Sequence, residues 1–243
     1  MPALYKTLLV AALLAAIAPV RAELAANIGV TSDYIWRGVS QSGESASVSG
    51  GIDYSSEGGF YAGTWVGSLD NGEEDFNGSE VDLYLGFAGE VAELSYDLGY
   101  IYYAYPSNDD IDFGEIYASL GWGDFTAGVA YTVNNAEGND FAEVGGGAGF
   151  ESGDLYAHLG YAAELEDDWS LGLTLGAYAF DADGKAYKAN ATDTESLTVD
   201  IDYLHYAIDF TKTTEMGDFT FTLSDTDQDD DDPRAVVSWG LSF

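Results

Sequence analysis

Arg37 is the residue whose type and surroundings point most directly to chemistry. It is the only basic side chain between Glu23 and Gly184, in a chain of 43 acidic and 7 basic residues. Carboxylates that share a lumen with such an arginine would form a charged constriction, the kind of ring that selects ions in pores. The predicted pore-lining residues are Arg37, Asp33, Asp82, Asp97, Glu115 and Glu143. The alternatives are a structural ion pair or an arginine that snorkels at a strand end, because a lone arginine among acids normally finds a partner.

The excess of acidic residues limits the partners of the chain. A formal net charge of −36 argues against nucleic acid, whose phosphates demand basic surfaces. Inward carboxylates predict a lumen that prefers cations. The acidity can equally reflect solubility or a saline habitat, and the two explanations do not exclude each other.

Two further groups of residues are weaker candidates. The acidic run at 225–232 fails as an EF-hand, since Asp230 and Val236 stand where glycine and glutamate are required. It predicts instead a solvated extracellular loop that divalent ions bridge to lipopolysaccharide. His158 and His205 are the only histidines, and no serine motif accompanies them. We therefore expect no enzyme, metal site or cofactor.

Alternation of apolar and polar residues shows which elements must position these side chains. Period two over about ten residues is typical of a strand with one apolar face, and the length suits a tilted strand that crosses a bilayer. Thirteen such runs lie near 25–37, 45–54, 59–67, 79–88, 92–104, 111–122, 124–133, 140–150, 154–163, 169–180, 197–212, 217–225 and 234–243. Bacterial barrels normally have even strand numbers, so we predict about twelve strands, with fourteen as the alternative if 185–191 adds one.

The phase of the alternation assigns side chains to faces. In the first run, Tyr34 and Trp36 share the phase of Ile28 and Val30 and should face lipid, which turns Asp33 and Arg37 toward the lumen. The run at 197–212 changes phase after Tyr203, which predicts a bulge or two elements.

Both ends of the chain carry export features. Residues 1–22 resemble a signal peptide, with Lys6, an apolar stretch and a cleavage site after Ala22. Residues 23–243 then form one domain, an all-β, closed, antiparallel, up-and-down transmembrane β-barrel with both termini in the periplasm. The last strand ends on a terminal aromatic. Its predicted membrane-insertion signal consists of Val237, Trp239, Leu241 and Phe243.

Two stretches resemble a known bacterial family. The first is SDYIWRGVSQ at residues 32–41, and the second is GGIDY at 50–54 followed by GFYAGTW at 59–65. This pattern is similar to the TorF-type porins, most strongly over residues 27–67 and more weakly to about residue 131. The resemblance implies an outer-membrane β-barrel and, as the family's name indicates, a pore. It brings no catalytic residues.

The sequence thus leads to three functional hypotheses. The first is an outer-membrane porin for small solutes, with a preference for cations. The second is a non-conducting structural or adhesion barrel whose acidic extracellular loops bind ions, and the third is a lipid-modifying outer-membrane enzyme. The expected partners are outer-membrane lipids, lipopolysaccharide, the machinery that inserts barrels, and small solutes or cations.

Overall fold

A computed structural model describes residues 23–70, 78–136, 150–181, 183, 186–187, 197–198, 201–228 and 231–243. The predicted signal peptide at 1–22 lies outside these residues. Within the described residues, no helix is long and apolar enough to cross a membrane.

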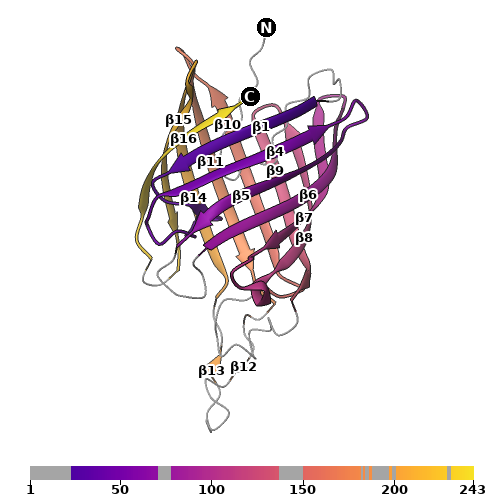
Figure 1. The fold of residues 1–243 in the computed structure, drawn as a ribbon, viewed down its shortest axis with the longest axis vertical. Coiled ribbons are helices and arrows are strands. Elements are labelled where there is room, and N and C mark those ends of the chain that lie inside the picture. Colours follow the sequence, from indigo (N-terminus) through magenta and orange to yellow (C-terminus); the bar gives the residue numbers. More distant parts are fainter. Residues whose placement is uncertain are drawn as a thin grey trace.

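Twelve of the described strands form one closed barrel, in which each pairs antiparallel with the strands beside it (Figure 1). This confirms the predicted all-β fold and strand number. The barrel strands are β1 (Glu23–Thr31), β4 (Ser47–Ser55), β5 (Phe60–Leu69), β6 (Gly78–Val91), β7 (Leu94–Ala104), β8 (Phe113–Trp122), β9 (Phe125–Asn135), β10 (Leu155–Glu164), β11 (Trp169–Ala179), β14 (Tyr203–Thr214), β15 (Gly217–Thr226) and β16 (Arg234–Ser242).

The connections at the two ends of the barrel differ in length. One end, the turn end, carries the short connections 56–59, 92–93, 123–124, 165–168 and 215–216. The other, the loop end, carries the longer connections 32–46, 70–77, 105–112, 136–154, 180–202 and 227–233. A one-turn 3₁₀ helix, η2 (Asp109–Ile111), lies in the third of these loops. The barrel closes where β1 pairs with β16, with Ile28 opposite Leu241 and Val30 opposite Trp239.

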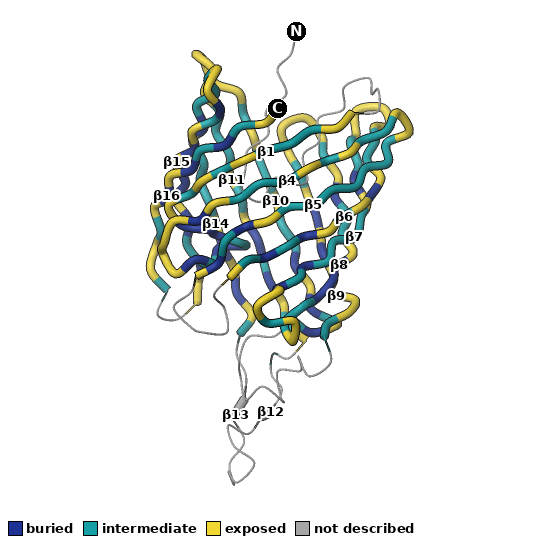
Figure 2. The backbone as a smooth tube through the Cα atoms, viewed as in Figure 1, coloured by how far each residue is buried: buried dark blue, intermediate teal, exposed yellow. Residues whose placement is uncertain are grey.

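The two faces of the barrel wall differ in polarity. Along β14, Leu204, Tyr206 and Phe210 are exposed on the outer face, whereas Tyr203 and His205 are buried. The tube in Figure 2 shows this alternation of exposed and buried residues along many strands. The outer face is a continuous apolar surface, and the polar side chains between the apolar ones point into the lumen.

Two expected strands do not belong to the barrel. The run near 140–150 lies, except for Phe150, outside the described residues, and β9 pairs directly with β10. The alternative fourteenth strand near 185–191 is wrong. There, β12 (Ala186–Tyr187) pairs with β13 (Leu197–Thr198) in a separate two-stranded sheet. The phase change within 197–212 therefore reflects two elements, β13 and β14.

Candidate functional site

The loop between β1 and β4 folds into the barrel instead of extending from it. We call residues 32–46 the inward segment. It contains a small hairpin of β2 (Ile35–Trp36) and β3 (Val39–Ser40), and its tip contacts strands on different sides of the wall. The expectation that the first strand continues to residue 37 is wrong, as is the lipid-facing position of Tyr34 and Trp36. Tyr34 is buried in an inner aromatic cluster, and Trp36 packs against it.

Local hydrogen bonds explain why the strand ends at Thr31. The Asp33 carboxylate accepts bonds from the hydroxyls of Ser40 (2.6 Å) and Ser42 (3.0 Å), and Ser42 Oγ accepts the Tyr34 N–H. These bonds close the segment on itself, because short polar side chains compete with a strand ladder for backbone groups. Asp33 is therefore buried and organises the loop, and its place among pore-lining residues stays a prediction.

Arg37 and Gly38 form the two-residue turn of the hairpin. Both have positive φ angles, 49° and 89°, in keeping with the type I′ turn that suits a tight hairpin. The turn places Arg37 at the tip of the inward segment. Tyr203 donates a hydrogen bond from its hydroxyl to the Arg37 carbonyl oxygen (3.1 Å).

The Arg37 guanidinium is held by one acid and by several aromatic rings. Its two terminal nitrogens donate to the two carboxylate oxygens of Glu115 at 2.8 and 2.6 Å. The guanidinium carbon also lies 4.2 Å from the ring centroids of Trp36 and Tyr156 and 5.1 Å from that of Tyr178. Glu115 is 1% exposed and adjoins a register shift between β8 and β9. Bulges of this kind re-aim side chains beside functional sites.

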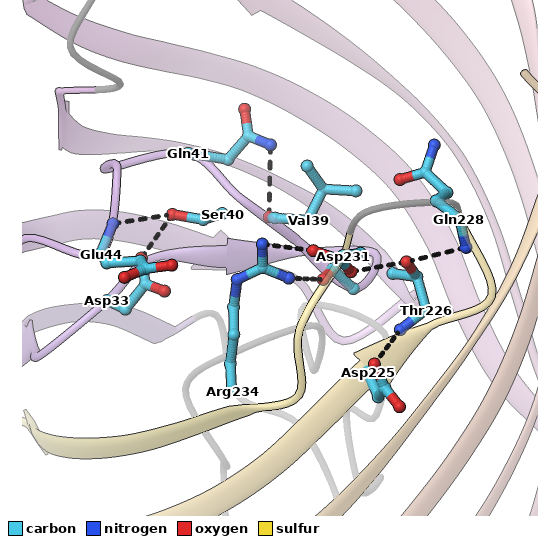
Figure 3. A network of polar contacts seen from close by, with 11 residues as sticks. Asp33, Val39, Ser40, Gln41, Glu44, Asp225, Thr226, Gln228, Asp231 and Arg234 are labelled. Carbon is cyan, nitrogen blue, oxygen red and sulfur yellow. Dashed lines mark hydrogen bonds and ion pairs between the residues drawn. The ribbon is translucent and has the colours of Figure 1, made fainter.

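Two more contacts hold the inward segment against the wall. Tyr34 donates a hydrogen bond from its hydroxyl to Glu80 on β6 (2.9 Å). At the seam of the barrel, Arg234 at the start of β16 pairs with Asp231 (2.6 Å) beside the hairpin (Figure 3). Arg234 also contacts the Gly38 carbonyl oxygen at 3.5 Å. Burial would raise the pKa of the Asp231 carboxyl, but hydrogen bonds from Arg234 and Thr226 outweigh burial and hold this pKa below its usual value.

Aromatic side chains fill the loop half of the lumen around the inward segment. Phe113 stacks on Tyr103 and on Phe150, with ring centroids 4.4 and 4.2 Å apart, and Trp36 meets Phe150 edge-on. On the other side, Tyr178 packs with Tyr156 and Tyr203. The inward segment and these rings therefore narrow the lumen at this level.

In the half of the barrel nearest the turn end, which we call the turn half, tyrosine rings pack on glycines of the wall. Tyrosine rings lie over glycines of the neighbouring strand, so a Cβ atom built on each glycine would lie within 2.6 Å of the ring. The pairs are Tyr84 on Gly63, Tyr61 on Gly86 and Tyr117 on Gly99. Rings in this position lie along the wall and do not extend across the lumen.

Three carboxylates lie among these residues and bond to neutral donors. Asp53 accepts from the Tyr84 hydroxyl (2.5 Å), and Asp97 accepts from the Tyr61 hydroxyl (2.5 Å). Asp209, on β14, accepts from the Thr222 hydroxyl (2.5 Å). Asp53 and Asp209 were missed in the sequence, although both stand between apolar outward residues and the alternation alone places them inside.

The remaining predicted residues are placed as follows. Asp82 is buried on the inner face of β6, two residues from Glu80, and Glu143 lies outside the described residues. Val237 is exposed on the outer face of β16, and Phe243, which follows that strand, is also exposed. Trp239 donates to the Met216 carbonyl oxygen (2.9 Å). Leu241 is only partly exposed and pairs with Ile28 across the closing seam.

Three described acids of the run at 225–232 take part in hydrogen bonds or an ion pair. Asp227 accepts the Leu204 N–H (2.7 Å), Asp231 pairs with Arg234, and Asp225 accepts from the Tyr206 hydroxyl. Asp229 and Asp230 lie outside the described residues. In the described part of the chain, no group of three or more histidine or acidic side chains is arranged to hold a metal ion.

Two solved structures with a similar fold are named as porins. The chain is similar to a KdgM porin, with 7% identity and a TM-score of 0.55, over 90% of this chain and 98% of that one. It is also similar to a NanC porin, with 12% identity and a TM-score of 0.51, over the same shares of the two chains. At these identities the likeness establishes the barrel fold alone.

Comparison of sequences places the chain in a family. No curated protein matches it significantly. The model of a family described as "Bacterial protein of unknown function (Gcw_chp)" matches residues 15–226, which include eleven of the twelve barrel strands. The chain therefore belongs to the Gcw_chp family of bacterial proteins.

Proposed function

We propose that this protein is an outer-membrane diffusion channel for small solutes with a preference for cations, narrowed by the inward segment. The observation that carries the proposal is the charge of the turn half. Asp53, Asp97 and Asp209 line the lumen and accept hydrogen bonds from tyrosine or threonine hydroxyls, which carry no positive charge. Fixed carboxylates in a narrow lumen attract cations and repel anions.

The distribution of positive charge supports the same preference. Arg37, which enters the lumen from the inward segment, is neutralised by its two bonds to Glu115. Arg234 is neutralised by Asp231. These two arginines therefore do not offset the three carboxylates of the turn half.

The outer surface supports a membrane location. Exposed Leu, Val, Phe and Trp side chains cover strands around the whole barrel, an arrangement that costs free energy in water and is favourable in lipid. We propose export through a signal peptide at 1–22, recognition of the last strand by the insertion machinery, and contact with outer-membrane lipids and lipopolysaccharide. The loop end is then extracellular. The TorF-type resemblance is in keeping with this proposal, although the matching family model carries another name.

A charge-matched pair of variants tests the preference for cations. The triple variant Asp53→Asn, Asp97→Asn, Asp209→Asn is expected to lower the potassium-to-chloride permeability ratio severalfold, because it removes three lumen charges. The measurement is the reversal potential in planar bilayers under a salt gradient. The control removes the same charge from exposed turns with Glu57→Gln, Glu93→Gln and Glu166→Gln, and it should leave the ratio unchanged. Equal shifts in both variants, or in neither, would contradict the assignment of selectivity to the lumen wall.

One observation favours the second candidate, a non-conducting structural barrel. Phe113 and Tyr178, both at most 1% exposed, each pack against Trp36 of the inward segment. If the lumen is closed at this level, the protein cannot conduct, and its acidic loops would carry the function. Bilayer recordings separate the two candidates, because only the first predicts current.

A further inference from the structure

A small cavity lies beneath the tip of the inward segment. It measures about 40 Å³, counted as space open to the centres of water-sized molecules. Because one water needs roughly 10–15 Å³ by this measure, the cavity holds about three waters or a group of two or three non-hydrogen atoms. Gly38 is on its inward-segment side. Its polar wall is formed by Thr174, His205, Asp209, Thr222 and Ser224.

Two of the residues that line this cavity have buried polar atoms without partners. Among the described residues, neither His205 Nδ1 nor Ser224 Oγ has a hydrogen-bond partner. His205 is 2% exposed and Ser224 is 3% exposed. The other ring nitrogen, His205 Nε2, is bonded to the Tyr156 hydroxyl at 2.9 Å. Buried polar atoms without partners are costly, so a bound group that gives one of them a partner is favoured.

The charges around the cavity favour a cation. Asp209 is the acidic side chain that lines it, and its described partner is the neutral Thr222 hydroxyl. Arg37 and Arg234 contact the wall nearby, but each is paired with an acid, Glu115 and Asp231 respectively. His158 is the other titratable ring near His205, and it stacks on Tyr156, outside the cavity lining.

We propose that this cavity binds the primary ammonium group of a small organic solute, an inference that rests on the proposed cation-preferring channel and names its substrate class. An ammonium group has three donors and no acceptor, and it matches a site of acceptors. Its acceptors in this cavity are the Asp209 carboxylate and Ser224 Oγ, which lie on the paired strands β14 and β15, two residues apart in register. His205 lies four residues from Asp209 along β14, about 13 Å away at the usual rise of a strand, so its ring responds to the bound group from the other end of the cavity. The size of the cavity suits a terminal CH₂–NH₃⁺ group.

Equilibrium binding of methylammonium chloride to the folded protein tests this proposal. The probe is added to protein labelled on histidine, and NMR follows the ring signals, which come from His158 and His205 alone. We expect a saturable shift of the His205 signals and a smaller response from His158. Asp209→Asn should weaken binding about tenfold or more, because a charged hydrogen bond is lost. Ser224→Ala should weaken it severalfold, and Glu166→Gln, a charge-matched control in an exposed turn, should leave it unchanged.

Two comparisons make the proposal easy to overturn. Tetramethylammonium carries the same charge without N–H donors, and it should produce no saturable shift. A His205 response that is absent with methylammonium, equal with tetramethylammonium, or insensitive to Asp209→Asn would contradict the proposal. Binding does not require conduction, so a protein that binds methylammonium but carries no current would fail as a channel and keep this site. A protein that conducts but does not bind methylammonium would contradict the binding site and leave the channel proposal intact.

Discussion

Replacement of Arg37 by alanine is expected to destabilise the folded barrel by about 3–5 kcal/mol. The reason is the carboxylate left behind. Glu115 is 1% exposed, and its two oxygens receive both terminal nitrogens of Arg37. A buried charge that loses its partner retains the full cost of desolvation. The measurement is reversible urea unfolding in lipid vesicles, followed by tryptophan fluorescence.

A double variant separates the buried charge from the lost contacts. Glu115→Gln combined with Arg37→Ala removes both charges, so it should recover a substantial part of the loss. Lys212→Ala serves as a control at the exposed pair Lys212–Asp168, where the separation is 3.8 Å, and should cost less than about 1 kcal/mol. An Arg37→Ala variant as stable as the Lys212→Ala variant would contradict the role of this ion pair.

Replacement of Gly38 by alanine is expected to displace the tip of the inward segment and widen the lumen. An alanine Cβ would lie 2.5 Å from His205 Cβ and 2.9 Å from Thr226 Cγ2, distances that require the hairpin or the wall to move. The backbone also has a φ of +89°, a conformation that costs alanine about 1–2 kcal/mol. The expected result is a larger single-channel conductance together with reduced stability, both measured on the refolded protein.

Gly123 provides the matched control for this substitution. It also has a positive φ, 57°, but a Cβ built there has no heavy atom within 4 Å. Gly123→Ala therefore carries the backbone cost without the collision, and it should reduce stability while leaving conductance unchanged. Equal conductance in Gly38→Ala and wild-type protein would show that the hairpin tip does not limit the current.

The barrel strands could be predicted because each has two different faces. Lipid on one side and a polar lumen on the other impose period two on the sequence, and most predicted runs agree with a strand to within a few residues. The position of the inward segment could not be predicted from this alternation. Ile35 and Trp36 continue the apolar character of β1, because the aromatic packing inside the loop half is as apolar as the outer face. The signals for a turn were Ser32-Asp33 and Arg37-Gly38.

The sequence limited the possible partners of Arg37 to a few acidic residues, but it could not identify which one forms the pair. Glu115 lies 78 residues away in the sequence, and the pairing depends on how deeply a loop enters the lumen and on a bulge in β9. Neither is a local property. Asp209 could have been found from its position between Ile208 and Phe210. Its role beside a cavity depends on Gly38, which belongs to a distant part of the chain.

Single-channel recording of the refolded wild-type protein in planar bilayers, under a salt gradient, tests the central claim most directly. The barrel should give discrete conductance steps, and the reversal potential should have the sign of a cation-selective pore. Folding is verified in the same sample by circular dichroism and by resistance to protease. An absence of steps from protein shown to be folded and inserted would contradict the claim that this lumen conducts.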